Sequence, residues 1–280
     1  MSARPRGHAP WRPRASSLAL VDLARELVEA EGHVLVRRVL YVASERGLTN
    51  NQGVPLDKVK KTHYGTVSDA LSRARRAGLL PWGAIIDTTE RMEPDGFDSP
   101  ADFRETVNAW AESYRIARQV GQPRYLVGWS EHRGLRAVLS PVAQEFGVPI
   151  AFSGGFDSTG GRFAEAERAR RRDVPTSVLH FGDRDKAGED IFDVVADDLQ
   201  QLSHGCIDEV VRVALTPEQM AAISPTAVTM QVDAAPVPTL RHLFEDAVLA
   251  RQDPDARQAV LSREPDERAE AVAWVKGWAA

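Results

Sequence analysis

Apolar residues in the first ninety positions recur at the spacing of amphipathic helices. They repeat every three to four residues over 17–30, 34–46 and 66–77, and Gly47 ends the second run. This period predicts three helices that each bury one face. Ser16 or Ser17 is the expected N-cap of the first helix, and Thr66 that of the third. A lysine-bearing turn followed by a basic third helix is typical of a helix-turn-helix or winged-helix unit.

The pattern changes from Tyr125 onward to short apolar runs that alternate with helical stretches. Such alternation is typical of a parallel sheet with crossover helices, so the fold class is α/β. The predicted strands cover residues 125–129, 148–152, 177–182 and 209–215. The predicted crossover helices cover residues 133–146, 162–172 and 188–202.

The segments between these two patterns divide the chain. Residues 87–100 are acidic and rich in turn formers, which predicts a domain boundary, and Ser99 and Pro100 begin a helix expected to reach Gln119. After Thr216 we expect helical pieces broken by prolines, including 239–251 and a closing helix. The predicted parts are a disordered basic arm (1–15), a DNA-binding domain (16–92), a linker and connecting helix (93–122), an α/β domain (123–215) and a helical C-terminal extension (216–280).

Charge is unevenly distributed. The chain carries 35 Lys and Arg against 40 Asp and Glu, a net charge of -5. Residues 1–92 hold 15 basic and 9 acidic residues (+6), and the rest hold 20 and 31 (-11). A basic first part and an acidic second part suggest that binding to nucleic acid belongs to the first.

Composition also limits the location and the metal chemistry. No run of about 18 apolar residues predicts a membrane span, and the Arg-rich start lacks the apolar stretch of a secretion signal, so we expect a cytoplasmic protein associated with the nucleoid. The single Cys206 cannot form an internal disulfide, and no cysteine or histidine pair has zinc-ligand spacing. Any bound metal should therefore be held by oxygen atoms.

Three acidic residues come directly after predicted strands. Glu131 follows the first strand, and Asp183 and Asp185 follow the third, in the sequence GDRDKAGED. Ligands of open parallel sheets bind at the carboxyl ends of strands, and residues i and i+2 of an extended chain point to the same side. Carboxylate oxygens suit Mg²⁺, with Mn²⁺ as an alternative. The sequence therefore predicts a metal site made of Glu131, Asp183 and Asp185.

Tyr41 is the candidate nucleophile. On a helical wheel it lies opposite the apolar face of its helix, so we expect it to point away from the core. Arg37 and Arg38 precede it by one turn, and their charges would favour the phenolate. A tyrosine can attack a phosphodiester and form a covalent phosphotyrosine.

Six further basic residues are candidates for contact with DNA phosphates. They are Arg38, Lys60, Lys61, Arg73, Arg75 and Arg76. The glycine-rich segment 153–162 lacks the Lys-Ser/Thr of a phosphate-binding P-loop, and we interpret it as a mobile loop near the metal. Asp233 lies in an extended segment and is interpreted as a structural acid.

These motifs resemble those of the A subunit of type IIB topoisomerases (topoisomerase VI) and of the related meiotic double-strand-break transesterase, especially their small stand-alone bacterial and mobile-element homologues. RRVLY (37–41) is similar to the Arg-x-x-x-Tyr motif of the winged-helix domain in that family. GWSEHRGLRAVL and HFGDRDKAGEDI resemble the glutamate and DxD motifs of its magnesium-binding toprim domain. The resemblance covers about residues 17–250.

The resemblance implies symmetric cleavage of double-stranded DNA by a homodimer. Tyr41 of each protomer, assisted by Arg37, would attack one strand beside the magnesium site of its partner. No ATP-binding signature occurs in the chain, so strand passage would need a separate ATPase subunit. The chain departs from the family pattern at Lys186, where proline is usual, at His132, where lysine is common, and at Leu40, where an aromatic residue is frequent.

Two other functions remain open at this stage. A toprim nuclease would hydrolyse DNA with a metal-bound water and use Tyr41 only structurally. A DNA-binding or partner-binding protein would keep the toprim shape without turnover. The products of the reaction with DNA distinguish the three.

Overall fold

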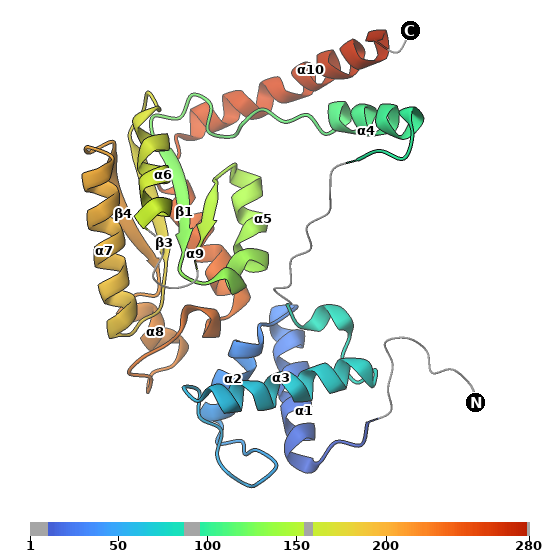
Figure 1. The fold of residues 1–280 in the computed structure, drawn as a ribbon, viewed down its shortest axis with the longest axis vertical. Helices are drawn as coiled ribbons and strands as arrows, with labels where there is room; N and C mark the ends of the chain where they lie inside the picture. Colours follow the sequence, from blue (N-terminus) through green and yellow to red (C-terminus); the bar gives the residue numbers. More distant parts are fainter. Residues whose placement is uncertain (1–10, 87–95, 154–158, 279–280) are drawn as a thin grey trace.

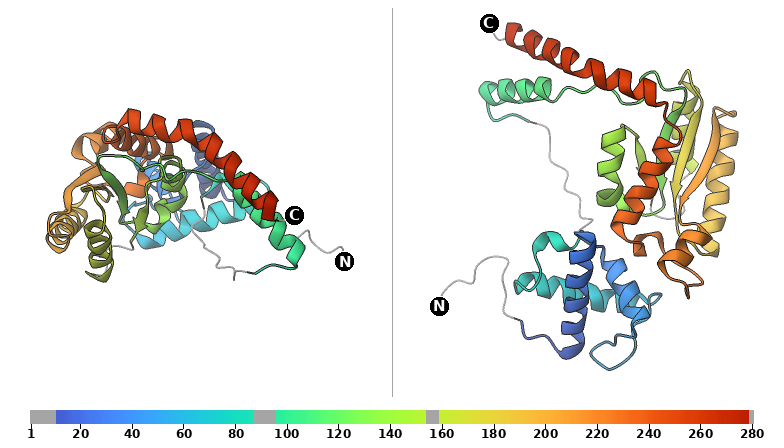
Figure 2. Two further views of the ribbon diagram at one scale, coloured as in Figure 1. Left: turned by 90° about the horizontal axis from the view of Figure 1, so that it is seen from above. Right: turned by 180° about the vertical axis from the view of Figure 1, so that it is seen from behind.

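A computed structural model describes residues 11–86, 96–153 and 159–278 (Figure 1). The first ten residues of the predicted basic arm, most of the acidic boundary segment and half of the glycine-rich loop lie outside the described residues. The chain forms a helical N-terminal domain beside a sheet domain, and a pair of helices projects from the latter (Figure 2). No helix within the described residues has the length and apolar character needed to cross a membrane.

The N-terminal domain contains the three predicted helices. They are α1 (Ala15–Glu31), α2 (Val36–Glu45) and α3 (Lys61–Arg76), followed by a short 3-10 turn, η1 (Trp82–Ala84). Their apolar faces share one core, in which Val21, Leu40 and Leu71 are almost completely buried. Only isolated bridges, Val34 with Ile85 and Thr49 with Pro55, pair extended backbone within residues 11–86. The three-helix unit is therefore present, whereas wing strands are not formed in this part of the chain.

The predicted start of the third helix is wrong by five residues. Thr66 does not cap α3, which begins at Lys61. The Thr66 hydroxyl instead donates to the carbonyl of Thr62 one turn earlier, at 3.0 Å, inside the helix. A threonine inside a helix can bond to the i-4 carbonyl, which the sequence pattern alone does not distinguish from a cap.

The sheet domain confirms the α/β prediction. Four parallel strands stand in the order β2-β1-β3-β4. The strands are β1 (Tyr125–Ser130), β2 (Ile150–Phe152), β3 (Thr176–Phe181) and β4 (Ile207–Ala214). The helices between them are η2 (Arg133–Leu135) continuing into α5 (Arg136–Phe146), α6 (Thr159–Arg170) and α7 (Lys186–Leu202).

Helices cover both faces of this sheet. One face packs against α5 and α9 (Val237–Leu249) through a core that includes Leu126, Leu179 and Phe181. The other face packs against α6 and α7 through residues that include Val127 and Trp129. Because adjacent residues of a strand point to opposite faces, the nearly continuous apolar runs of β1 and β3 are buried on both sides.

The remaining helices differ from expectation at two places. The connecting helix α4 (Pro100–Glu112) ends before Gln119, because the Gln119 side chain bonds the backbone N–H and carbonyl of Leu126, at 2.6 and 3.1 Å, and so ties this segment to the sheet. After α8 (Pro217–Ile223) and η3 (Val232–Ala234), the last helix, α10 (Pro254–Trp278), continues through Pro265. α10 packs along α4, and the two form the projecting pair (Figures 1 and 2).

Candidate functional site

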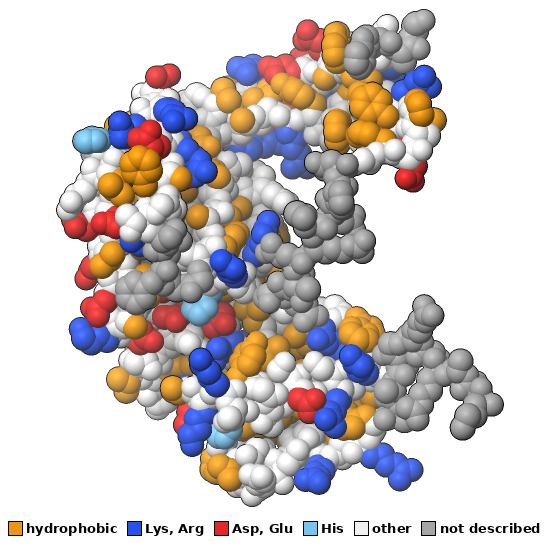
Figure 3. All heavy atoms as spheres, viewed as in Figure 1, with side chains coloured by type: hydrophobic (Ala, Val, Ile, Leu, Met, Phe, Trp, Pro, Cys, Tyr) orange, Lys and Arg blue, Asp and Glu red, His pale blue; other side chains and the backbone are white. Residues whose placement is uncertain are grey.

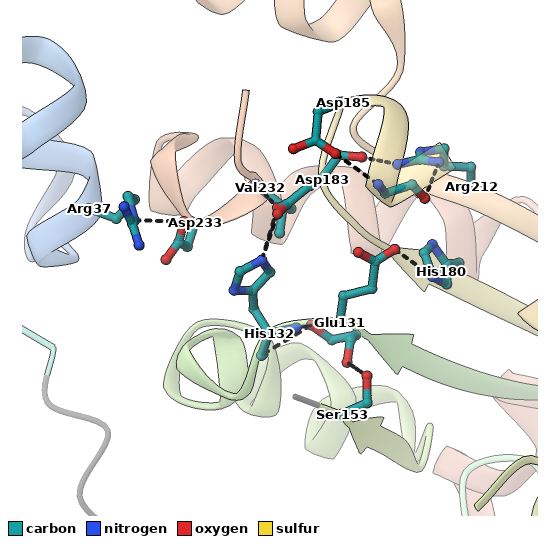
Figure 4. Close-up of polar contacts among 12 residues, drawn as sticks. Arg37, Glu131, His132, Ser153, His180, Asp183, Asp185, Arg212, Val232 and Asp233 are labelled. Carbon is teal, nitrogen blue, oxygen red and sulfur yellow. Dashed lines mark hydrogen bonds and ion pairs between the residues drawn. The ribbon is translucent and has the colours of Figure 1, made fainter. Parts of the chain in front are cut away.

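The three predicted metal ligands lie at the carboxyl edge of the sheet. β1 ends at Ser130 and β3 at Phe181, and these strands are neighbours in parallel register. Glu131 and Asp183 therefore leave the sheet on the same edge, with Asp185 two residues further along (Figure 4). Glu131 is almost fully buried. The edge is thus acidic, with Glu131 buried and the two aspartates partly exposed.

Asp183 is the centre of the polar contacts at this edge. His132 Nε2 lies 2.9 and 3.0 Å from its two carboxylate oxygens, and the backbone N–H of Val232 donates to Oδ1 at 2.8 Å. Burial lowers the pKa of His132, but the hydrogen bond and charge of Asp183, together with Asp233 and Glu131, outweigh it and raise the pKa to about 9. His132 is therefore an imidazolium near neutral pH, paired with Asp183.

Asp185 begins the next helix. Its carboxylate accepts from the backbone N–H of Gly188 at 2.8 Å and so caps α7. Position 188 has no room for a side chain, since a Cβ atom there would lie 2.3 Å from the carbonyl oxygen of Asp183. The spacing DxDxxG thus follows from a capped helix whose first turn packs tightly against the backbone of Asp183.

Glu131 has an unsatisfied oxygen atom. Its Oε1 is buried and lies 3.2 Å from Nε2 of the fully buried His180, but neither atom has a partner in hydrogen-bonding geometry. Burial lowers the pKa of His180, which is therefore neutral. A Cβ atom at Gly182 would come within 2.0 Å of this Glu131 oxygen, so the glycine leaves the space in which the carboxylate lies.

The donor atoms suit a hard cation, although they do not converge here. Glu131 Oε1 lacks a partner, and carboxylate oxygens are the ligands that Mg²⁺ prefers. Asp183 is engaged by His132 and Val232, and Asp185 caps a helix. Within the described residues, no three acidic, histidine or cysteine side chains are close enough together to hold a metal ion. A bound cation would therefore have to replace contacts that Asp183 makes now.

Tyr41 points away from the core of its own domain, as predicted, but it is not exposed to solvent. The Tyr41 side chain is 3% exposed and packs in the core cluster of the sheet domain. It therefore lies in the interface between the two domains. Its hydroxyl donates to the Thr229 carbonyl at 2.6 Å and accepts from Lys58 Nζ at 2.7 Å. The Lys58 ammonium also lies 4.0 Å from the centre of the tyrosine ring. The helical wheel gave the correct direction but could not show what lies there.

The expected activation of the phenol is not present in this arrangement. Burial, with the nearby negative charge of Glu45, raises the pKa of Tyr41 to about 12. Arg37 does not flank the hydroxyl: its guanidinium lies 4.7 Å from the Tyr64 ring centre and 3.7 Å from Asp233. The cation beside the hydroxyl is Lys58, which the sequence placed in the lysine-bearing turn without a role.

A cavity of about 160 Å³ joins the tyrosine to the carboxylate edge. Tyr41, Lys58 and Asp185 line it, together with Val59 and residues 229–231. The cavity lies between the N-terminal domain and the carboxyl end of β3. The structure therefore brings the predicted nucleophile and one predicted metal ligand to the same hollow of a single chain.

One short segment, residues 224–235, contacts the site at several points, and no motif in the sequence indicated this role. Thr229 accepts from Tyr41, Met230 pairs with Arg184 in an antiparallel bridge, and Val232 donates to Asp183. Asp233, interpreted from sequence as a structural acid, is buried beside Arg37, and burial raises its pKa. The segment thus bonds both to the N-terminal domain and to the carboxylate edge (Figure 4).

The predicted DNA-contacting residues fall into two groups. Arg38 and Arg75 are largely buried: Arg38 pairs with Glu31 at 3.0 Å and donates to the Ala234 carbonyl at 3.4 Å, and Arg75 lies 5.3 Å from the Trp82 ring centre. Neither is placed to reach DNA in this arrangement. The exposed members are Lys60, Lys61, Arg73 and Arg76. Lys and Arg side chains are scattered over the visible face of the N-terminal domain (Figure 3).

Comparison with known proteins gives no match. No family model, no curated protein and no solved structure matches the chain. The geometry of the site is therefore the basis for a functional proposal.

Proposed function

We propose that the protein is a magnesium-dependent DNA-cleaving transesterase, similar to the topoisomerase VI A subunit, with a winged-helix-type N-terminal domain and a toprim-type sheet domain. One observation carries the proposal: Tyr41, Lys58 and Asp185 line a single cavity at the carboxyl edge of the sheet. A tyrosine hydroxyl, an ammonium group and carboxylates are the groups that transfer of a phosphodiester to tyrosine needs.

In the proposed reaction, the Tyr41 oxygen attacks a DNA phosphorus atom. The new phosphorus–tyrosine bond replaces the bond to the 3′ oxygen, which leaves and takes up a proton, while the phenol loses one. The protein then remains attached to the 5′ end, and no oxidation or reduction occurs. The Lys58 ammonium, 2.7 Å from the phenol oxygen, would stabilise the negative charge on that oxygen.

Glu131 and Asp183 would hold the metal ion, with Asp185 beside them. When bound, Mg²⁺ supplies positive charge to the phosphate oxygens during transfer. Glu131 Oε1 is buried without a partner and would gain one. Asp183 would exchange His132 for the ion, and the freed imidazolium would remain at the edge of the site as a further positive charge.

The arrangement described here is closed, and the proposed reaction requires it to open. Tyr41 donates to Thr229 and its pKa is raised to about 12, so the hydroxyl is neither accessible to DNA nor readily ionised. If residues 224–235 moved away, the Tyr41 hydroxyl would lose its bond to Thr229 and Asp183 would lose its bond to Val232 at the same time. The shared cavity places the tyrosine beside a carboxylate of its own chain, so the reaction is proposed within one protomer; the homodimer that the family resemblance implies would cleave both strands, and strand passage would use a separate ATPase subunit.

The burial of Tyr41 also favours a second candidate. If the Tyr41–Thr229 bond is permanent, Tyr41 holds the two domains together and the carboxylates serve metal-dependent hydrolysis of DNA. This candidate predicts cleaved DNA with no protein attached. It uses the same acidic residues but not the tyrosine.

Cleavage of supercoiled plasmid with Mg²⁺ or Mn²⁺, followed by denaturation and detection of protein on DNA 5′ ends, separates the candidates. We expect an adduct with the native chain and with Tyr125→Phe, a control at the far end of β1, and none with Tyr41→Phe or Asp183→Asn. Cleavage that survives Tyr41→Phe but not Asp183→Asn would replace the transesterase by the hydrolase. Absence of any cleavage, with DNA binding intact, would overturn both and leave a binding protein.

A further inference from the structure

The N-terminal domain contains a second, larger cavity that the proposed reaction does not use. It lies between the start of α1 and the exposed face of α3 and has a volume of about 450 Å³. The residues that determine its chemistry are Trp11, Arg12, Arg14, Asn51, Asp69 and Arg73.

The lining of this cavity is positively charged. Arg12 and Arg14 are exposed and form no ion pair with any residue in the described part of the chain. Arg73 pairs with Asp69 at 3.0 Å, so the single acidic residue of the lining is already neutralised. Two arginine charges are therefore left for a ligand. Arginine presents several N–H donors in a geometry that matches phosphate oxygens.

The start of α1 adds to this positive potential. α1 has 17 residues, its N-cap Arg14 provides no side-chain cap, and its first turn contains no acidic residue. The first N–H groups of the helix thus lack a side-chain acceptor, and they lie at the positive end of the helix dipole. Asn51 Oδ1, the nearby acceptor, is taken by the hydroxyls of Ser16 and Ser17, at 2.7 and 3.3 Å. An anion at this place would find these N–H donors and the two arginines, with Asp69 paired to Arg73.

Trp11 gives the cavity an aromatic wall. The indole is partly buried and packs against the hydrophobic core of the N-terminal domain, which fixes its position. Aromatic side chains provide stacking surfaces for bases, and the volume lies in the range of about 300–1,000 Å³ in which small-molecule sites fall. The cavity therefore has room for more than a phosphate ion, namely for a phosphate with its attached sugar or base.

We propose that this cavity binds a nucleotide unit of a DNA strand, with the phosphate at Arg12, Arg14 and the start of α1 and the base or sugar against Trp11. The identity of the ligand as DNA rests on the proposed function; the preference for a nucleotide rests on the cavity. On α3 the cavity is lined from Thr66 to Arg73, about 8 to 18 Å along the helix from Lys61 at 1.5 Å per residue. The cavity is thus an anchor for DNA that flanks the cleavage site.

Binding of labelled duplex and single-stranded oligonucleotides to the full chain tests this proposal. Fluorescence anisotropy is measured at several salt concentrations with a metal chelator present, so that no cleavage occurs and a failure of the proposed reaction does not affect the result. We expect Arg12→Ala/Arg14→Ala to weaken duplex binding and to reduce the slope of log K against the logarithm of salt concentration by about 0.9, since the two arginines share one phosphate. Trp11→Leu, which keeps an apolar side chain on the core, should weaken single-strand binding about tenfold.

Arg104→Ala/Arg115→Ala is the matched control, since it removes two exposed arginines of the chain outside the N-terminal domain. Equal effects of the two double variants would overturn the proposal, because they would show a dependence on net charge alone. A pocket that binds mononucleotides but does not contribute to oligonucleotide binding would also overturn it, in favour of a free nucleotide. A chain that binds DNA through Arg12 and Arg14 but never cleaves it would support this inference and refute the transesterase.

Discussion

Replacing Tyr41 with phenylalanine tests whether the closed arrangement of the site exists in solution. The substitution keeps the ring in the interface and removes only the hydroxyl. That hydroxyl donates to the Thr229 carbonyl at 2.6 Å and accepts from Lys58 at 2.7 Å, and the side chain is 3% exposed. Phenylalanine therefore removes the donor to the Thr229 carbonyl and the acceptor of Lys58 while it keeps the apolar packing of the ring.

The magnitude follows from these two contacts. An intramolecular hydrogen bond contributes about 0.5–1.5 kcal/mol to stability. Lys58 is partly buried and Thr229 is exposed, so both groups can regain water and the loss should stay within that range. The midpoint of thermal unfolding falls by about 2–4 °C per kcal/mol in domains of 150–250 residues, so we expect a decrease of a few degrees.

Thermal unfolding followed by circular dichroism at pH 7 provides the measurement. Tyr125→Phe is the control, because the structure gives the Tyr125 hydroxyl no hydrogen bond within the described residues, and its midpoint should stay unchanged. An unchanged midpoint for Tyr41→Phe would show that the hydroxyl is not bonded to Thr229 in solution. The argument that the site must open would then be wrong, even if the tyrosine is the nucleophile.

Three further outcomes are expected. Mg²⁺ should stabilise the folded protein, by about 2.7 kcal/mol when its concentration is 100 times the dissociation constant, and so raise the midpoint of thermal unfolding. Glu131→Gln should abolish this stabilisation; if it persists, Glu131 is not a ligand. The hydrogen bond from Arg251 lowers the pKa of Glu209 to about 2, so the stability that this pair contributes is present above about pH 4.5 and is lost as pH falls towards 2. Glu209→Gln should therefore reduce the fall in the free energy of unfolding between pH 4.5 and 2, and an unaltered pH dependence would contradict the pairing. Glu264→Gln should loosen α10, because the buried carboxylate pairs with Arg118 of the segment that leads into β1; trypsin should then cut α10 faster than in an exposed Glu270→Gln control, and equal rates would argue against that anchor.

Much of the fold follows from local sequence patterns. Short apolar runs separated by helical stretches predicted the four strands and their parallel arrangement, because strands and helices have different periods. The ends of β1 and β3 then placed Glu131, Asp183 and Asp185 at one edge, since parallel neighbours end on the same side. Errors of a few residues arose where a side chain bonds the backbone in a way that the pattern does not reveal, as at Thr66 and Gln119.

The state of the site was decided by tertiary structure alone. Tyr41 and Thr229 are 188 positions apart, and Arg37 and Asp233 are separated by a similar distance along the chain. No helical period or motif relates such residues, so neither the burial of the tyrosine nor the role of segment 224–235 could be read from either part separately. The sequence by itself determined which groups are present and on which element each lies. Only the tertiary structure decided that the phenol meets Lys58 and the Thr229 carbonyl rather than Arg37, because side-chain neighbours and desolvation depend on distances between segments that the sequence pattern does not relate.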